Sequence, residues 1–409
     1  MVTRRGRLAL AAGAGARWAS RVTGRGAGAM IGGLIALALD RSILSQLGRG
    51  RRTIVVTGTN GKSTTTRMAA AALATTGQVA TNAEGANMDA GLVAALAAAR
   101  DASLAVLEVD EMHVPHVSDA VDPSVVVLLN LSRDQLDRVG EINHIERTLR
   151  SGLARHPAAV VIANCDDVLM TSAAYDSPNV VWVAAGGGWA GDSVSCPRSG
   201  EIIIRDGNHW YSTGMAFKRP EPDWWFDADH LYGPGGLSLP MSLALPGAVN
   251  RGNATQAVAA AVTLGADPVA AVAAVSRVDE VAGRYKTVQV GSHTARLLLA
   301  KNPAGWQEAL SMLDRAAAGV VIAVNGQVPD GEDLSWLWDV RFEHFETVQV
   351  VAAGERGTDL AVRLGYAGVE HTLVHDTVRA IESCPSGHVD VIANYTAFLQ
   401  LNRALERLK

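Results

Sequence analysis

A short segment near residue 60 has the residue types and spacing of a phosphate-binding loop. It follows a β-branched run at 53–56, precedes an alanine-rich stretch at 67–76, and consists of Gly58, Thr59, Asn60, Gly61, Lys62, Ser63 and Thr64. A strand, a glycine turn and a helix in this order surround polyphosphate with backbone N–H groups. The Lys62 ammonium would then neutralise the β- and γ-phosphates, and the Ser63 hydroxyl would bind Mg²⁺. Val56 replaces the first glycine of the general P-loop, so the pattern is narrower than that of NTPases at large.

An acidic cluster follows the apolar run at 104–107 and begins with Glu108. A carboxylate at the C-terminal end of a strand beside a phosphate loop is well placed to hold a metal ion. Glu108 is therefore the predicted second ligand of Mg²⁺. The alternative is an acid at a solvated strand edge.

Apolar runs alternate with helical segments along most of the chain, which predicts doubly wound parallel sheets. The expected strands are 103–107, 124–129, 159–163, 180–184, 294–300, 320–324, 347–351, 371–374 and 389–392, and the expected helices include 24–39, 142–153 and 253–264. The pattern breaks between 188 and 232, where short strands, turns and aromatic residues indicate an insertion. We expect an α/β protein with a basic helical segment at 1–52, a nucleotide-binding domain at 53–287, and a smaller domain at 288–409.

Composition excludes several classes of protein. Hydrophobic residues make up 48% of the 409 residues and charged residues 19%, which excludes extensive disorder. A net charge of −5 argues against a nucleic-acid binder, and three cysteines are too few for a disulfide framework, which indicates a reducing cytosol.

The first 52 residues are strongly basic. They contain ten arginines and one acid, a net charge of +9, so residues 53–409 carry −14. The longest uncharged run, 26–39, is 14 residues long, and a membrane span needs about 20. This segment is therefore expected to be a helix that lies either on the protein or on an anionic membrane surface.

The phosphate loop and three other segments resemble the ATP-binding core of the Mur ligase superfamily; these segments are 82–88, 108–111 and 130–138. Members of that superfamily activate a carboxylate as an acyl phosphate and then form an amide. Further segments are similar to the MurT-type branch, the synthetase subunits of lipid II isoglutaminyl synthases; they are 217–220, 301–305, 330–339 and 394–396. The resemblance implies a Mur ligase-type ATP-binding central domain with a small β insertion, followed by a Rossmann-like C-terminal domain.

The resemblance also implies roles for three residues outside the loop. Asn253 matches an asparagine that reads adenine, and an amide can pair with the N6/N7 edge of that base. Arg284 matches an arginine that meets the γ-phosphate, and Lys301 would reach the nucleotide from the second domain. A helix cap and a surface salt bridge are the alternatives for Asn253 and Arg284.

Asp333 has a different implied role. Proteins of this branch work as heterodimers with a GatD-type glutaminase that supplies ammonia, and an aspartate of the synthetase orients the glutaminase histidine. Asp333 matches that aspartate, with Asp330 and Asp339 as the other candidates. Trp336 and Trp338 alternate, so they are expected to share one face of a strand and to pack against the partner.

Two departures from the family pattern bear on chemistry. Gln135 stands where these ligases commonly have histidine, so a proton-transfer role there is in doubt. Many relatives carry a four-cysteine zinc ribbon in the insertion, but this chain keeps only Cys196 of the first pair and has 212–215 at the second. A degenerate ribbon without zinc is therefore expected, since one thiolate cannot form a tetrahedral site. A site formed by Cys196, His209 and His230 is the alternative, and the expected stabilising aromatic residues are Trp210, Tyr211, Trp224 and Trp225.

The implied activity is ATP- and Mg²⁺-dependent amidation of the D-glutamate α-carboxylate of lipid II, by a cytoplasmic protein that is peripheral to the inner face of the plasma membrane. The residues before the loop are too few for the domain that holds a UDP-sugar in other members, which fits a lipid-linked substrate. The alternatives are a ligase that adds an amino acid without a glutaminase, such as a folylpolyglutamate synthetase relative, and an inactive nucleotide-binding scaffold.

Overall fold

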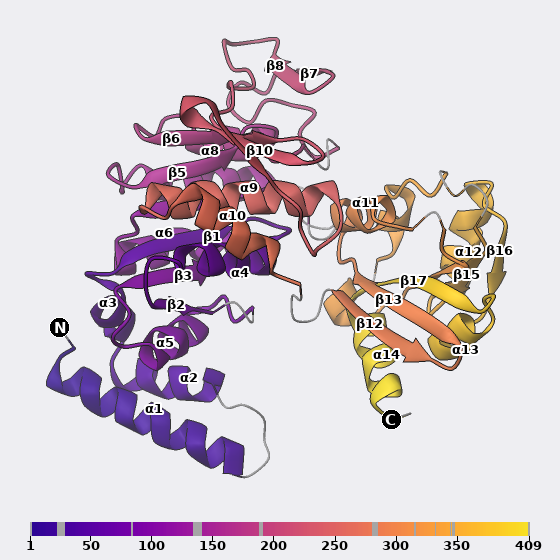
Figure 1. Cartoon of the computed structure of the whole chain (residues 1–409), viewed down its shortest axis with the longest axis horizontal. Helices are drawn as coiled ribbons and strands as arrows, with labels where there is room; N and C mark the ends of the chain where they lie inside the picture. Colours follow the sequence, from indigo (N-terminus) through magenta and orange to yellow (C-terminus); the bar gives the residue numbers. More distant parts are fainter. Residues whose placement is uncertain are drawn as a thin grey trace. The chain divides into compact units, whose positions relative to one another are not determined.

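The computed structural model divides into two compact units (Figure 1). Unit 1 comprises Met1–Leu131 and Gly140–Asp279, and unit 2 comprises Ser132–Val139 and Glu280–Lys409. The residues described are 2–22, 29–82, 85–133, 141–187, 191–279, 285–314, 316–331, 333–343, 345 and 348–407. The domain limits expected from the sequence, 1–52, 53–287 and 288–409, stay predictions.

The centre of unit 1 is a parallel sheet of six strands in the order β2-β3-β1-β4-β5-β6. Its strands are β1 (Arg52–Thr57), β2 (Val79–Thr81), β3 (Leu104–Glu108), β4 (Val125–Leu128), β5 (Val160–Asn164) and β6 (Val180–Val183). Every residue of β3 and β4 is buried. Strands covered on both faces are apolar throughout, which explains why the sequence located the last four of these strands correctly.

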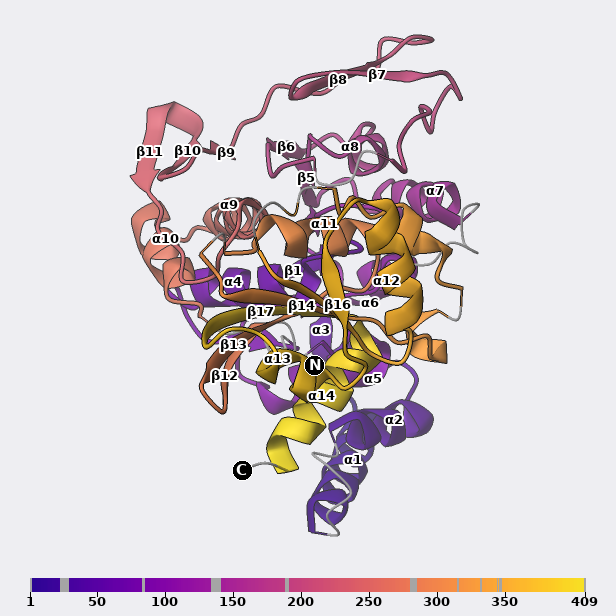
Figure 2. The same cartoon turned by 90° about the vertical axis from the view of Figure 1, so that its right-hand side faces the viewer.

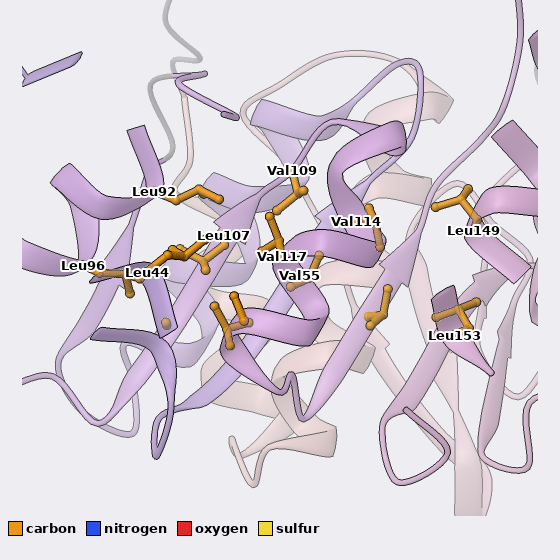
Figure 3. Packing of buried hydrophobic residues seen from close by; sticks show 14 of the residues in the cluster. Leu44, Val55, Leu92, Leu96, Leu107, Val109, Val114, Val117, Leu149 and Leu153 are labelled. Carbon is orange, nitrogen blue, oxygen red and sulfur yellow. The ribbon is translucent and has the colours of Figure 1, made fainter. Parts of the chain in front are cut away.

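Helices cover both faces of this sheet. On one face α4 (Lys62–Leu73), α9 (Ala248–Thr263) and α10 (Pro268–Ser276) pack against one another. The other face carries α3 (Ile43–Gly48), α5 (Asp89–Ala98), α6 (Val114–Val121), α7 (Glu141–Leu153) and α8 (Val168–Ala174). Figure 3 shows the core beneath the second set, which contains the strand residues Val55 and Leu107 and the helix residues Leu92, Val117 and Leu149. Helix α1 (Arg4–Val22) packs on α2 (Ala29–Leu39), and α2 packs on α5.

The insertion forms two small sheets. The strands are β7 (Ile203–Asp206), β8 (His209–Ser212), β9 (Trp225–Phe226), β10 (His230–Gly233) and β11 (Leu237–Pro240). Trp210 is buried, packs on Phe217 at 4.9 Å between ring centroids, and donates its indole N–H to the Cys165 carbonyl at 3.0 Å. Trp224 is also buried, as expected. Tyr211 and Trp225 instead expose 47% and 40% of their surface, and Trp225 stacks on Tyr232 with 5.3 Å between ring centroids.

Unit 2 contains a second sheet of six strands in the order β12-β13-β17-β14-β15-β16, in which β12 pairs antiparallel with β13 and the other pairs are parallel. The strands are β12 (Tyr285–Val290), β13 (His293–Leu299), β14 (Gly319–Ala323), β15 (Val350–Ala353), β16 (His371–Leu373) and β17 (Gly387–Ala393). Two separate cores lie on its faces: one is formed with α13 (Thr377–Glu382) and α14 (Tyr395–Arg407), the other with α11 (Pro303–Ser311) and α12 (Gly357–Tyr366) (Figure 2).

Both units are α/β layers around largely parallel sheets, which confirms the predicted fold class. Among the helices in the described residues, none is long and apolar enough to cross a bilayer. The cysteines Cys165, Cys196 and Cys384 are buried free thiols.

Candidate functional site

The phosphate-binding loop joins the central strand β1 to α4, and two of its glycines have backbone angles that other residues rarely adopt. The φ angles are +143° at Gly58 and +83° at Gly61. A Cβ on Gly58 would lie 2.8 Å from the Cβ of Leu129, and one on Gly61 would lie 2.8 Å from Oδ1 of Asn253. No side chain caps the start of α4. The N–H groups of its first turn are therefore available to a phosphate, at the positive end of the helix dipole.

Asn130 holds the loop in shape. Its Oδ1 accepts the Asn60 N–H at 2.9 Å, its Nδ2 donates to the Asn60 carbonyl at 3.0 Å, and its own carbonyl accepts the Thr59 N–H at 2.9 Å. Sequence reasoning included Asn130 in a family segment without giving it a role. Its position directly after an apolar strand could have indicated a role in the site. The C-terminal ends of parallel strands lie along one edge of a sheet, so polar residues that follow different strands come close together there.

Lys62 is held at the mouth of the loop. Its Nζ lies 2.5 Å from the Gly58 carbonyl oxygen and 3.4 Å from both carboxylate oxygens of Glu111. The two side chains are only 12% and 11% exposed, so they pair largely out of contact with water. Glu111 was not predicted as a site residue, and its position opposite Lys62 depends on the turn η1 (Glu111–His113) that follows β3.

Glu108 ends β3 and is 3% exposed. In the sheet it pairs with Val56, the second-last residue of β1, and β1 leads directly into the loop. Asn82 fixes its backbone: Oδ1 accepts the Glu108 N–H at 2.8 Å, and Nδ2 donates to the carbonyls of Glu108 and Ala86, each at 2.9 Å. Sequence reasoning did not assign this clamp to Asn82.

Ser63 and the segment at 82–88 also come together. A Cβ on Gly85 would lie 3.8 Å from the Ser63 hydroxyl oxygen. Of this segment, Gly85 therefore lies near Ser63, and Asn82 bonds the backbone of Glu108, so each is beside one of the predicted Mg²⁺ ligands. A hydroxyl and a buried carboxylate are oxygen donors of the kind that Mg²⁺ prefers, so the residues fit that ion.

Asn253 reaches the loop from the helix α9. It is 6% exposed, its amide faces Gly61, and its Nδ2 donates to Oδ1 of Asn250 at 3.4 Å. Because Asn253 is the sixth residue of α9, the interpretation as a helix cap was wrong. Arg284 and residues 134–138, including Gln135, lie outside the described residues.

Lys301 belongs to unit 2, where it follows β13. It is exposed, and its Nζ lies 5.1 Å from the centroid of the Tyr395 ring, a cation–π distance. Asn302, the next residue, caps α11 by accepting the Gly305 N–H at 2.8 Å. These contacts orient Lys301 at the C-terminal edge of the second sheet.

The rest of that edge is a hydrogen-bonded polar network. The Asn325 N–H donates to Oδ1 of Asn394 at 3.0 Å, and Asn394 Nδ2 donates back to the Asn325 carbonyl at 2.7 Å. The Asp330 carboxylate accepts the Thr396 N–H at 2.9 Å and the Thr396 hydroxyl. The network thus joins the ends of β14 and β17, and its polar groups form hydrogen bonds with one another.

The three candidate aspartates for partner binding have different environments. Asp330 is 8% exposed and belongs to that network. Asp339 forms an ion pair with Arg133, with 3.7 Å between Nη2 and Oδ2. Asp333 is exposed, and the Ser335 N–H, which it accepts at 2.9 Å, lowers the pKa of its carboxyl below the usual value. Asp333 is therefore an accessible, ionised carboxylate.

Trp336 and Trp338 do not share a face. They lie in a 3₁₀ turn, η5 (Ser335–Trp338), rather than a strand, so the predicted strand geometry was wrong. Residues two apart in a turn of three residues point in different directions. Trp336 is 5% exposed and stacks on Trp306 in the core, whereas Trp338 is 56% exposed and meets Tyr366 at 5.3 Å between ring centroids.

Two turns of the insertion bring together the segments 196–199 and 212–215, which the sequence analysis compared with the cysteine pairs of a zinc ribbon. Cys196 and Met215 are 4.0 Å apart at their sulfur atoms, and the Ser199 and Ser212 hydroxyls are 3.3 Å apart. Burial raises the pKa of the Cys196 thiol, but hydrogen bonds from Ser199, two backbone N–H groups and Ser212 outweigh it, and the net pKa is lowered. His209 is exposed at the turn between β7 and β8. Within the described residues, no three His, Cys, Asp or Glu side chains gather as a metal site.

The parallel sheet, the glycine loop after its central strand, Lys62 in that loop and the buried Glu108 at the end of the adjacent strand are the features of Mur ligase-type ATP-binding domains. Residues 56–261 match the model of the Mur ligase middle domain, and residues 299–398 match that of the MurT ligase C-terminal domain.

Two named relatives are similar over nearly their whole length. Each is called lipid II isoglutaminyl synthase (glutamine-hydrolyzing) subunit MurT. The protein of Staphylococcus aureus strain COL is 30% identical over 96% of both chains, and that of Streptococcus pneumoniae strain R6 is 29% identical over 93% of both. The chain therefore belongs to the MurT family of Mur ligases, and it is a ligase.

Solved structures agree on the fold. A pseudomurein peptide ligase type C from Methanothermus fervidus is 16% identical and superposes with a TM-score of 0.70, over 90% of this chain and 81% of that chain. MurF from Acinetobacter baumannii is 19% identical, with a TM-score of 0.67 over 91% and 80%. At these identities the likeness concerns the fold alone.

Proposed function

We propose that this chain is the synthetase subunit that converts the D-glutamate α-carboxylate of the lipid II stem peptide to D-isoglutamine. The observation that carries the ATP-dependent part is the loop geometry, with an uncapped start of α4, Lys62 at the loop mouth and the buried Glu108 at the adjacent strand end. The names of the two similar relatives support the substrate. The reaction takes place in the cytoplasm, at the inner face of the plasma membrane.

The proposed reaction has two steps. An oxygen of the carboxylate forms a bond to the γ-phosphorus of ATP while the bond to the bridging oxygen breaks, and ADP leaves. Ammonia then attacks the acyl carbon, phosphate departs with that oxygen, a proton is lost, and the amide remains. Lys62 holds the terminal phosphates during the first step, and the N–H groups of α4 hold the charge that develops on them.

Ser63 and Glu108 are the proposed ligands of Mg²⁺, which when bound neutralises charge between the β- and γ-phosphates. Asn253 is the proposed adenine contact, and Arg284 and Lys301 are proposed phosphate contacts. The loop residues Gly58, Thr59, Asn60, Gly61 and Thr64 supply backbone and hydroxyl groups to the nucleotide.

Ammonia comes, in this proposal, from a GatD-type glutaminase that forms a heterodimer with the chain. Asp333 would accept a hydrogen bond from the partner's catalytic histidine and fix its tautomer. Its exposure supports this role over the buried Asp330 and the ion-paired Asp339. Asp333 lies two residues before the turn η5, and Trp338 is the last residue of that turn. The exposed pair Trp338 and Tyr366 offers an aromatic contact of the kind that dominates protein interfaces.

The test is amidation of lipid II by the chain co-purified with the candidate glutaminase, with either glutamine or ammonium as donor. Asp333→Asn should lower glutamine-dependent activity by about 10³- to 10⁴-fold and leave ammonium-dependent activity intact. Asp339→Asn is the matched control and should keep both activities. Full glutamine-dependent activity in Asp333→Asn would refute the assignment.

Other outcomes separate the alternative functions. ADP release that needs an amino acid and no glutaminase would indicate an amino-acid-adding ligase. Absence of ATP turnover in the wild type would indicate a scaffold. We also propose that the insertion is metal-free, and zinc at a stoichiometric level in the purified protein would contradict this.

A further inference from the structure

The helices α1 and α2 form an N-terminal hairpin at the outer side of α5 (Figures 1 and 2). Small residues allow its close packing. A Cβ on Gly13 would collide with the Gly32 carbonyl, and one on Gly33 would collide with the backbone of Ala90 in α5. Backbone therefore approaches backbone on the inner face, where Ala9, Leu10 and Ala36 are the buried side chains.

Those large side chains point outwards from α1. Arg4, Arg7, Leu8 and Trp18 are all exposed, with exposed fractions of 72% for Leu8 and 68% for Trp18. At 3.6 residues per turn these four positions fall within an arc of about 100°. Helix α1 thus has one outer stripe in which guanidinium groups stand beside an aliphatic and an indole side chain.

The exposed surface of α2 is apolar. Met30, Ile31, Leu34 and Leu39 expose 44%, 41%, 58% and 46% of their surface. A large apolar surface on a soluble chain usually marks a binding surface for protein or membrane. The six exposed apolar side chains of this hairpin come from only two short helices.

Among the described residues of the hairpin, Asp40 offsets little of the positive charge. The one acid among residues 1–52, Asp40, is buried, and its carboxylate accepts from Ser42 and Gln46. Within the described part of the chain, Arg4 and Arg7 have no carboxylate within ion-pair distance. In contrast, Arg51 donates to four backbone carbonyls and Arg52 to one, so these two arginines are structural.

A small groove adds two more arginines. It has a volume of about 80 Å³, runs between the hairpin and α5, and is lined by Gly13, Gly32 and Ala97 with Arg17 and Arg100. Arg17 and Arg100 thus add guanidinium groups, which bind phosphate well, beside the hairpin.

We propose that the α1–α2 hairpin docks on an anionic phospholipid surface and lies in its plane. Basic residues together with tryptophan and leucine on one helix face are typical of interfacial helices, and arginine is attracted to anionic headgroups. Charge complementarity selects this occupant over a second copy of the same chain, whose hairpin carries the same positive charge. The inference goes beyond the ligase chemistry and does not depend on it, because docking needs neither nucleotide nor glutaminase.

Vesicle co-sedimentation of the full chain without nucleotide tests this. The protein should bind vesicles of phosphatidylcholine mixed with phosphatidylglycerol, bind pure phosphatidylcholine far less, and dissociate as salt is raised. The double variant Arg4→Glu, Arg7→Glu should lower the partition coefficient by at least about 25-fold, since each lost arginine counts for about fivefold. The double variant Leu8→Ser, Trp18→Ser should also weaken binding.

Matched controls distinguish binding through the hairpin surface from an effect of the net charge of the protein. Arg147→Glu with Arg403→Glu makes the same charge change at exposed positions on α7 and α14, and Val269→Ser removes an exposed apolar side chain from α10. Both should bind as the wild type does, and thermal melting should show all variants folded. Equal loss in the control pair, no vesicle binding by the wild type, or a dimer that the hairpin variants dissociate would overturn the proposal.

Discussion

The C-terminal edges of the two parallel sheets use polar residues in different ways. At the edge of unit 1, the loop leaves the N–H groups of α4 uncapped and holds the Lys62 ammonium beside Glu111. At the edge of unit 2, Asn325 and Asn394 bond each other, and Asp330 bonds Thr396. The first edge presents unsatisfied backbone donors to a ligand, whereas the second satisfies most of its polar groups internally.

The difference shows how one architecture serves two purposes. Parallel strands place polar residues along one edge in both units, because every strand ends there. A glycine loop leaves donors free for phosphate, while paired amides and a buried carboxylate stabilise the fold and leave only groups such as Asp333 and Lys301 at the surface. Substitutions at the first edge are thus expected to affect ligand binding, and substitutions at the second edge are expected to affect the stability of the fold.

Among the changes that compare the two edges, the loss of the Lys62 ammonium has the largest expected effect. Lys62→Ala should lower ATP turnover by about 10³-fold, because the transferring phosphoryl group loses its cation. Arg67→Ala, which removes an exposed positive charge from the same helix, is the control and should retain turnover. Equal rates for Lys62→Ala and the wild type would mean that the first edge does not act on ATP.

Gly61→Ala should weaken ATP binding by about 10- to 100-fold, because a side chain at this φ is strained and would push Asn253 away from the loop. Calorimetric titration with ATP measures this. Gly50→Ala is the matched control, since Gly50 has a φ of +85° with nothing within 4 Å of the added Cβ. If both variants bind ATP equally well, the close contact at Gly61 has no role in the site.

At the second edge, Asp330→Ala should lower the free energy of unfolding of unit 2 by about 2–3 kcal/mol, because the buried Thr396 N–H loses its acceptor. Urea unfolding, followed by a spectroscopic signal that comes from unit 2, measures this free energy. Asp333→Ala, on an exposed carboxylate, should leave the unfolding curve unchanged. A curve for Asp330→Ala that matches the wild type would show that the network is not what stabilises this edge.

The smallest expected effect is at Glu111. Glu111→Gln should tighten ATP binding by about two- to fivefold, because it removes a negative charge that competes with phosphate for Lys62. Binding measured at low and high salt should show the gain shrink as salt is raised. Weaker binding would instead mean that Glu111 positions Lys62 productively.

Much of the fold followed from local patterns. The strands β3 to β6, the five strands β13 to β17 and the helices α2, α7 and α9 were predicted because their apolar residues are contiguous or periodic. The phosphate loop was equally clear, since its function needs neighbouring residues in one turn. The helix α1 lies within the segment 1–52, which was predicted to be helical but without bounds for this helix, because its glycines and alanines show no strong periodicity.

Contacts between distant segments were not predictable. The clamp of Asn82 on Glu108 and the pairing of Lys62 with Glu111 join residues 26 and 49 positions apart. Trp336 and Trp338 show the same limit: their spacing suggested a shared face, but a 3₁₀ turn sent one into the core and the other to the surface.

The sequence by itself determined the α/β class, the phosphate loop with Lys62 and Ser63, and the family, because each depends on residues that lie close along the chain. Only the tertiary structure decided that Asp330 is buried and Asp333 exposed, that Asn130 and Asn253 flank the loop, and that Arg4 and Arg7 face solvent while Arg51 and Arg52 serve the fold. The physical reason is that burial and hydrogen-bond partners are set by which segments pack together, and a residue's type alone does not specify this.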